Sequence, residues 1–211
     1  MTLQTPRGTR DLVPEEMEKR NRIIDIIRKT YESYGFLPLE TPAFESWELL
    51  SKKGGGGDAI KDEIYYFKDK SGRELALRFD LTVPLSRFIA TNPQIAKPFK
   101  RYQIGRVWRY DRPQAGRFRE FEQADIDIIG SASMEADAEC IAAVSDVLKS
   151  LGLKNFVIRV NNRKILNSMI KSLNLEKKAK DIFRILDKME KAGENETTEE
   201  LKKIDKNAVR I

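Results

Sequence analysis

The sequence predicts an α+β fold in which an antiparallel sheet is flanked by helices. A helix-like segment comes first, several strand-like segments then follow one another with short turns, and a long helix-like segment comes after them. Consecutive strands joined by short turns favour antiparallel pairing, whereas a doubly wound nucleotide-binding fold would alternate strands with helices. The 211 residues are enough for one good-sized domain with a small appendage.

The first expected element is a helix over residues 14–34. Pro14 suits the first helical turn, and Glu15 and Glu16 complement the positive end of the helix dipole. Gly35 is a suitable residue to end the helix. One face is apolar and would pack inward, with Met17, Ile24, Ile27, Tyr31 and Tyr34.

An extended stretch follows, because Pro38 and Pro42 disfavour a helix at the start of "FLPLETPAFESWELL". A short helix is expected near Trp47. The run Gly54–Gly57 cannot form a packed element, so we expect a flexible loop there, natural or engineered. It lacks the Lys-Ser/Thr pair and the helix start of a phosphate-binding loop.

Two strands are predicted at residues 63–69 and 73–82, because "EIYYFKD" and "RELALRFDLT" flank a "KSG" turn and indicate a hairpin. Pro84 then opens a short helix through about Ala90. Residues of the second strand alternate between two faces, with Leu75, Leu77, Phe79 and Leu81 on one and Arg78, Asp80 and Thr82 on the other.

Two further strands, residues 99–110 and 120–130, are joined by the loop 111–119. In the second of them one face is apolar and the other polar, with Ala124, Ile126 and Ile128 opposed to Gln123, Asp125 and Asp127. If these strands are neighbours of the strand that carries Asp80, one sheet face presents a polar set beneath an arginine-rich loop. That set is Asp80, Thr82, Arg109, Gln123 and Asp127.

The remaining elements are a helix at 134–151, a strand at 155–161 ("NFVIRVN") and lysine- and glutamate-rich helices from Arg163 onward. We expect a core domain at residues 1–170 and a helical segment at 171–211. The inward residues would be Ala138, Ile141, Leu148 and Leu151 in the first helix, and Ile182, Ile185, Leu186 and Met189 in the tail.

Composition excludes several classes of chemistry. The chain has no histidine, which removes Ser-His-Asp triads, Cys-His pairs and most zinc sites. Its one cysteine, Cys140, allows no internal disulfide and suits a small core residue in a reducing compartment. We see no membrane-length apolar run and no signal peptide, and we expect a cytoplasmic protein. The net charge of +6 permits a nucleic-acid or nucleotide partner.

The polar residues suit a ligand that carries both signs of charge. Asp80 and Asp127 can accept hydrogen bonds from a cation, and Gln123 can donate and accept. Arginine forks suit phosphate or carboxylate, and an aromatic ring beside them could stack on a base. An amino acid together with ATP would satisfy the whole set, although each arginine alone could equally form an ordinary cross-strand ion pair. These arginines are Arg109, Arg112, Arg117 and Arg119, and the aromatic residues are Phe118 and Phe121.

Four stretches closely resemble histidyl-tRNA synthetases, a family of class II aminoacyl-tRNA synthetases. "RGTRDLVPEE" (7–16) is similar to the family's opening, and "PLETPAFESWELL" (38–50) resembles motif 1, with Pro42 as its proline. "LRFDLTVPLSR" (77–87) resembles the amino-acid-binding segment, and "RYQIGRVWRYDRPQAGRFREFEQADIDIIG" (101–130) resembles motif 2 nearly throughout. The resemblance is close over residues 6–170 and loose in the helical tail, which looks like the start of the family's insertion domain.

The resemblance implies an enzyme that forms histidyl-adenylate from L-histidine and ATP with Mg²⁺ and transfers histidine to tRNA-His. Asp80, Leu81 and Thr82 would hold the α-amino group with help from Gln123, and Asp127 would meet the imidazole. The catalytic residue would be Arg109, which would bridge the histidine carboxylate and the α-phosphate. No protein side chain is expected as a metal ligand.

The other implied contacts of the resemblance lie around the loop. Asp111 would contact the adenine, Arg117 the γ-phosphate, and Phe121 would stack on the base. Gln114 would approach the acceptor end of the tRNA. Motif 1 around Pro42 implies a homodimer.

The family's "RGLDYY" motif, its motif 3 and its anticodon-binding domain are not found in the sequence, so we expect little or no aminoacylation by this chain alone. One alternative is the synthetase-like regulatory subunit of ATP phosphoribosyltransferase. This alternative is weakened because a non-catalytic paralogue could lose the predicted site residues, and here they are intact. They are Asp80, Thr82, Arg109, Gln123 and Asp127. Another alternative is a non-catalytic RNA-binding or scaffold fragment, which the positive charge permits.

Overall fold

The computed structural model describes residues 3–52, 63–110 and 116–210, so Gly54–Gly57, Asp111 and Gln114 lie outside the described residues. The chain forms two compact units, Met1–Phe156 and Val157–Ile211. Helix α5 (Arg163–Ser172) packs into the core of the second unit through Ile170.

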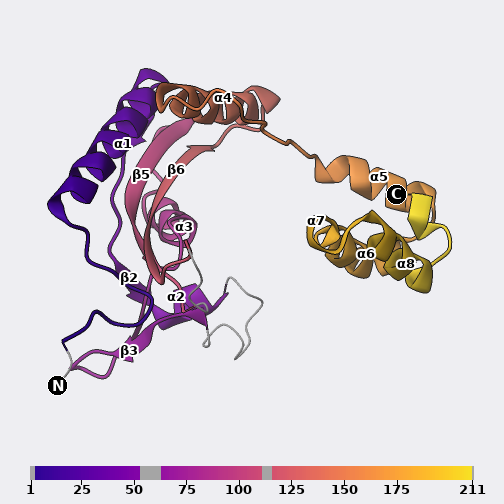
Figure 1. Ribbon diagram of the computed structural model, residues 1–211, viewed down its shortest axis with the longest axis horizontal. Helices are drawn as coiled ribbons and strands as arrows, with labels where there is room; N and C mark the ends of the chain where they lie inside the picture. The colour runs from indigo at the N-terminus through magenta and orange to yellow at the C-terminus, as the bar shows by residue number, and fades with distance from the viewer. Residues whose placement is uncertain (1–2, 53–62, 111–115, 211) are drawn as a thin grey trace. The chain divides into compact units, whose positions relative to one another are not determined.

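The first unit is built on a three-stranded sheet in the order β1-β5-β6 (Figure 1). Strands β5 (Phe99–Trp108) and β6 (Glu120–Ile129) form a long antiparallel hairpin in full register. Strand β1 (Leu37–Pro38) runs parallel to β5, so the predicted antiparallel sheet is confirmed with one short parallel edge.

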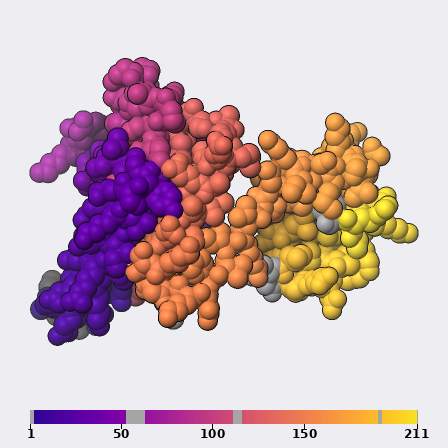
Figure 2. Space-filling model, turned by 90° about the horizontal axis from the view of Figure 1, so that it is seen from above, coloured from indigo at the N-terminus to yellow at the C-terminus, as the bar shows by residue number. Residues whose placement is uncertain are grey.

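Helices α1 (Pro14–Ser33) and α4 (Met134–Ser150) lie side by side and cover one face of this hairpin (Figures 1 and 2). Ala124, Ile126 and Ile128 of β6 face these helices as predicted. Tyr31 is buried in the same core. The full core comprises Tyr31, Phe36, Tyr102, Ala143 and Val147.

The inward face predicted for the helix at 134–151 is only partly observed, since Leu151 packs against the core as predicted but the buried residues of α4 are others. Ala138 is exposed, whereas Ala143 and Val147 are buried and Cys140 lies against them. The buried face of α4 is set by its contacts with α1 and β6. The apolar pattern of a single alanine-rich helix predicts such a face poorly.

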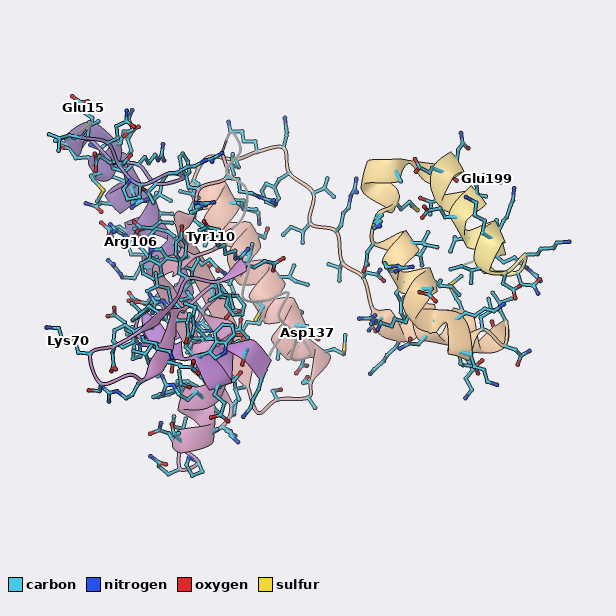
Figure 3. The ribbon with its side chains drawn as sticks, turned by 90° about the horizontal axis from the view of Figure 1, so that it is seen from below. Glu15, Lys70, Arg106, Tyr110, Asp137 and Glu199 are labelled. Atoms are coloured by element: carbon cyan, nitrogen blue, oxygen red, sulfur yellow. The ribbon has the colours of Figure 1, made fainter. Side chains whose placement is uncertain are left out.

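A second, smaller sheet has the order β2-β4-β3 and is antiparallel throughout. Its strands are β2 (Phe44–Ser46), β4 (Glu74–Leu77) and β3 (Tyr66–Lys68). The predicted hairpin is therefore confirmed, with Lys70 at its exposed turn (Figure 3). The short helix near Trp47 is α2 (Trp47–Ser51), and the Ser46 side chain caps it by accepting from Leu49 N.

The strand predicted to reach Thr82 ends at Leu77, and helix α3 (Thr82–Thr91) begins with Thr82 itself. Asp80 Oδ1 accepts a hydrogen bond from Val83 N at 3.0 Å, a contact that favours a helix start at this point. The expected burial is reversed over residues 75–80, whereas Leu81 of the predicted apolar face is fully buried. Ala76, Arg78 and Asp80 are the buried residues, whereas Leu75, Leu77 and Phe79 are only half-buried.

The strand predicted at residues 155–161 does not form. Val157 is 84% exposed and Val160 is 68% exposed. A strand needs a hydrogen-bonded neighbour, and no described strand lies beside this segment.

The second unit is helical, as expected, with α5, α6 (Ala179–Leu186), α7 (Met189–Ala192) and α8 (Glu194–Ile204). Two short 3₁₀ helices, η3 (Glu176–Lys178) and η4 (Ala208–Arg210), complete it. Its buried core is Ile170, Leu175, Ile182, Ile185, Leu201 and Ala208. Met189, predicted to face inward, is 44% exposed. Among the residues that the structure describes, no helix combines the length and apolar character that crossing a membrane requires.

Candidate functional site

The face of the hairpin that turns away from α1 and α4 carries the candidate site. Strand alternation places Phe121, Gln123, Asp125 and Asp127 of β6 on this face. Opposite them on β5 lie Val107, Gly105, Gln103 and Arg101, in direct register. The polar alternation predicted for β6 is therefore confirmed by the pairing, and β5 adds a fully buried arginine that the prediction omitted.

The segment from Asp80 to Thr82 is brought to this face by hydrogen bonds to its backbone. Arg109 Nε donates to Phe79 O at 3.0 Å, and Arg101 Nη2 donates to Leu81 O at 3.5 Å. Asp80 is 5% exposed and Leu81 is fully buried, while Thr82 is exposed. These residues meet the hairpin as a turn and a helix start, where the sequence had predicted a strand.

Arg109 joins three parts of the site. Its backbone N–H donates to Arg119 O at 2.9 Å, its Nε bonds Phe79 O, and its Nη2 donates to Gln123 Oε1 at 3.3 Å. Its guanidinium carbon lies 5.1 Å from the centroid of the Phe121 ring. The guanidinium is thus held in place by the protein, as a group must be if it is to meet developing charge without reorganising.

Arg101 and Asp127 form the other end of the site. Arg101 Nη2 lies 2.6 Å from Asp127 Oδ2, and the two residues are direct cross-strand partners. The Arg101 side chain is fully buried, whereas that of Asp127 is 31% exposed. Burial lowers the pKa of Arg101, and the charges of Asp127 and Asp125 act against that shift.

Asp125 lies between Gln123 and Asp127 on the same face. Burial raises the pKa of Asp125, Arg101 and a hydrogen bond from Gln123 oppose the shift, and the charges of Asp127 and Asp80 add to it. Three carboxylates therefore crowd one end of the face around a single buried arginine. Such an end favours a cation, while Arg109 at the other end favours an anion.

Two residues proposed from the sequence as phosphate or base contacts are engaged elsewhere. The Arg119 guanidinium lies 4.0 Å from the Tyr110 ring centroid, and its backbone N–H donates to Gly8 O at 2.7 Å. Phe118 lies under Arg10, at 4.4 Å from ring centroid to guanidinium carbon. These contacts fasten the N-terminal segment to the hairpin. Arg117 is exposed at the edge of the described loop, and Arg112 lies outside the described residues.

Arg78 is a buried residue that supports the site, and its role was not predicted from the sequence. It is 4% exposed, and its Nε donates to Arg106 O at 2.9 Å while its Nη1 donates to Thr41 O at 2.5 Å. Burial lowers its pKa. Gly105 makes room for it, because a Cβ at that position would lie 2.7 Å from Arg78 Nη2. Burial of an arginine is uncommon, so no signal in the sequence beyond its alternation with Asp80 pointed to this role.

A family model for histidyl-tRNA synthetase matches residues 8–210. A histidine–tRNA ligase from Aeropyrum pernix is 47% identical over 200 residues, which cover 94% of this chain and 46% of that protein. The chain therefore spans a little under half the length of this relative.

Two solved structures are similar over nearly the whole chain. A histidyl-tRNA synthetase from Nostoc sp. PCC 7120 has a TM-score of 0.85 and 36% identity, covering 100% of this chain and 47% of that one. A protein described as an ATP phosphoribosyltransferase regulatory subunit/histidyl-tRNA synthetase from Bacillus halodurans C has a TM-score of 0.83 and 27% identity, covering 97% and 52%. Both likenesses agree with the α+β fold and its class II synthetase topology.

Proposed function

The chain belongs to the histidyl-tRNA synthetase family, and from this premise we propose that its protein activates L-histidine with ATP and transfers it to tRNA-His. The observation that carries the proposal is the division of charge on the hairpin face. Asp80, Asp125 and Asp127 gather at one end, and Arg109 is fixed at the other. A zwitterionic amino acid placed between them would meet the opposite charge at both ends.

In this proposal histidine lies on the hairpin with its imidazole toward Asp127. Its α-amino group is held by Asp80 and Thr82 beside the Leu81 backbone, and by Gln123. Support comes from the joining of these two parts, since Arg101 contacts both Asp127 and Leu81 O. The Asp127 carboxylate would select histidine, because an amino acid whose side chain has no hydrogen-bond donor could not bond to it.

ATP is proposed to bind along the Arg109 end. Phe121, whose ring already faces the Arg109 guanidinium, would stack on the adenine, and Arg117 would meet the γ-phosphate. Asp111, outside the described residues, would contact the adenine. The histidine carboxylate attacks the α-phosphorus as the bond to pyrophosphate breaks. Arg109 stabilises the charge on the α-phosphate, and no protein base is needed because the attacking carboxylate is already ionised.

Chemistry of this kind generally uses a divalent cation, and Mg²⁺ is proposed to be carried by the phosphates of ATP. Mg²⁺ commonly binds through substrate phosphates and water with few protein ligands. Among the residues that the structure describes, no cluster of three or more carboxylate or thiolate side chains is placed to hold a metal ion. No step of the proposed reaction is assigned to a metal held by protein side chains.

Further proposals concern the partners of the protein. Gln114 would approach the acceptor end of tRNA-His, and a homodimer would form through motif 1. Support for the dimer comes from apolar side chains near Pro42, since Leu37 is 59% exposed and Phe44 is 50% exposed. We propose a cytoplasmic location, a synthetase core within residues 1–170, and an insertion domain that begins in the helical segment 171–211.

Thermal unfolding of the chain with added ligands tests the proposed function. L-Histidine should raise the melting temperature, while alanine and glutamine at equal concentration should not. Asp127→Asn should remove most of the stabilisation, and the exposed control Asp181→Asn should retain it. Equal stabilisation by all three amino acids, or by none, would refute histidine recognition by this site.

A second assay distinguishes the proposed synthetase function from the regulatory-subunit alternative. The full-length protein should catalyse histidine-dependent exchange of pyrophosphate into ATP, and Arg109→Lys should reduce the rate by on the order of a hundredfold. Histidine binding without exchange would favour the regulatory role named for the similar protein from Bacillus halodurans C. The curated relative with 47% identity, which is named a ligase, favours exchange.

A further inference from the structure

We propose that Arg101 is a positioning residue for histidine, which fixes Asp127 and the backbone of Leu81 at the spacing that the amino acid needs. This inference rests on the proposed function, because it takes Asp127 and the Asp80–Thr82 segment as the two parts that hold histidine. Arg101 itself is fully buried, so it acts through these residues without touching the ligand.

One nitrogen of Arg101 reaches both parts of the site. Nη2 lies 2.6 Å from Asp127 Oδ2 on β6 and 3.5 Å from Leu81 O at the start of α3. Asp127 and Leu81 belong to different elements, and Arg101 is the residue of β5 directly opposite Asp127. The guanidinium is thus a rigid bridge between the imidazole end and the amino end of the site.

The environment of Asp127 explains why such a bridge is needed. Asp125 and Asp80 carry like charges nearby, and like charges would push an unpaired Asp127 carboxylate away from them. The Asp127 side chain is 31% exposed, so packing alone does not hold it. In this proposal the short ion pair with Arg101 holds the Asp127 carboxylate at its place on the hairpin face.

The remaining donors of Arg101 argue against a purely structural role. Among the described residues, Nε and Nη1 of Arg101 have no hydrogen-bond acceptor. A buried arginine with unsatisfied donors costs stability. The contacts that its Nη2 makes are to the two parts of the site, Asp127 and Leu81 O.

The test measures L-histidine and ATP affinities of the chain by calorimetry, together with its melting temperature. Arg101→Met removes the charge at similar volume, and Arg101→Lys keeps the charge but loses the rigid fork. Histidine affinity should fall about tenfold or more in Arg101→Met and by a smaller factor in Arg101→Lys, as expected when the residue that orients a binding carboxylate is lost. ATP affinity should change by less than about twofold, since Arg109 is untouched.

The matched control is Arg106→Met, on the same strand but, by strand alternation, on its other face. Arg106 pairs with Glu120 and Glu122 outside the site, so both affinities should stay unchanged. In an Asp127→Asn background, Arg101→Met should weaken histidine binding little further, because the two residues act as one unit.

The outcomes separate the inference from the proposed function. Histidine binding by the wild-type chain that survives Arg101→Met would overturn the positioning role and leave the proposed function intact. The positioning role would also be overturned if Arg101→Met lowered the histidine and ATP affinities by the same factor and lowered the melting temperature. Such losses are expected of a residue that only supports the fold. A wild-type chain that does not bind histidine would overturn the proposed function, and the inference with it.

Discussion

Asp125 is a residue whose ionisation the folded chain opposes. Burial raises its pKa, so the folded state binds this proton more tightly than the unfolded state. The stability gained from the protonated carboxyl is complete below the ordinary aspartate pKa and is lost as the pH rises through the higher folded value. Asp125→Asn should therefore raise the melting temperature at about pH 7, and the gain should shrink toward about pH 3.5.

Asp69 supplies a control of opposite sign. Hydrogen bonds from Arg73 lower its pKa, so Asp69→Asn should reduce the melting temperature at neutral pH and lose its effect in acid. A destabilised Asp125→Asn variant at neutral pH would show that the carboxylate stabilises the fold. Because the substitution also removes a negative charge beside Asp127, it should weaken histidine binding while it strengthens the fold.

Position 105 requires a glycine because a neighbouring side chain leaves no room for a Cβ, and not because of the backbone angles there. Its φ lies outside the left-handed region, but a Cβ would approach within 2.7 Å of Arg78 Nη2. That guanidinium cannot easily withdraw, because it is bonded to Arg106 O and Thr41 O. Gly105→Ala should lower the free energy of unfolding by about 1–3 kcal/mol, measured by urea denaturation.

The origin of this cost can be isolated with a double-mutant cycle. Arg78→Lys removes Nη2, so Gly105→Ala should cost much less in that background than in the wild type. Equal costs in both backgrounds would place the strain in the backbone of β5.

At the scale of elements, one ion pair joins the small sheet to the helix that begins at the site. Arg87 of α3 donates from Nε and Nη2 to Glu45 of β2 at 2.7–2.9 Å. The Glu45 side chain is 7% exposed, so truncating its partner would leave a nearly buried, unpaired carboxylate. Arg87→Leu should cost about 2 kcal/mol or more in the free energy of unfolding.

The control for this pair is Arg73→Leu, which breaks the exposed contact with Asp69 and should have a much smaller effect. Arg87→Leu should also weaken histidine stabilisation, since α3 carries Thr82 at its first position. Unchanged stability and unchanged histidine binding in the Arg87→Leu variant would show that this ion pair does not support the site.

The elements also show how far the sequence could predict the site. Alternation predicted the polar face of β6, because Gln123 and Asp127 sit in a long strand whose other face meets helices. It failed at Thr82, because the cap formed by Asp80 starts a helix where the pattern continues as a strand. Arg101 and Arg78 were not predicted, since arginines are ordinarily exposed and only register reveals what they face.

At the scale of the whole molecule, the chain forms two compact units that divide between Phe156 and Val157. The sequence places no glycine- or proline-rich linker after Phe156, and "NFVIRVN" is predicted to be a strand. In the structure the segment from Val157 to Asn162 connects two separate cores without a helix or strand of its own. Each core has its own buried apolar residues, so the boundary depends on tertiary contacts that local patterns do not record.

This organisation predicts where a protease will cut the described part of the chain. An elastase-type enzyme that cleaves after valine should cut first at Val157 or Val160, which lie outside helix and strand and are more than two-thirds exposed. Val144 is also exposed, at 38%, but lies within α4 and should be cut on the order of tenfold more slowly, because a helix must open locally before cleavage. After cleavage both products should keep their circular dichroism, since each unit contains a complete core. Cleavage at Val144 as fast as at Val157, or loss of helical signal once the connection is cut, would show that the two units fold as one.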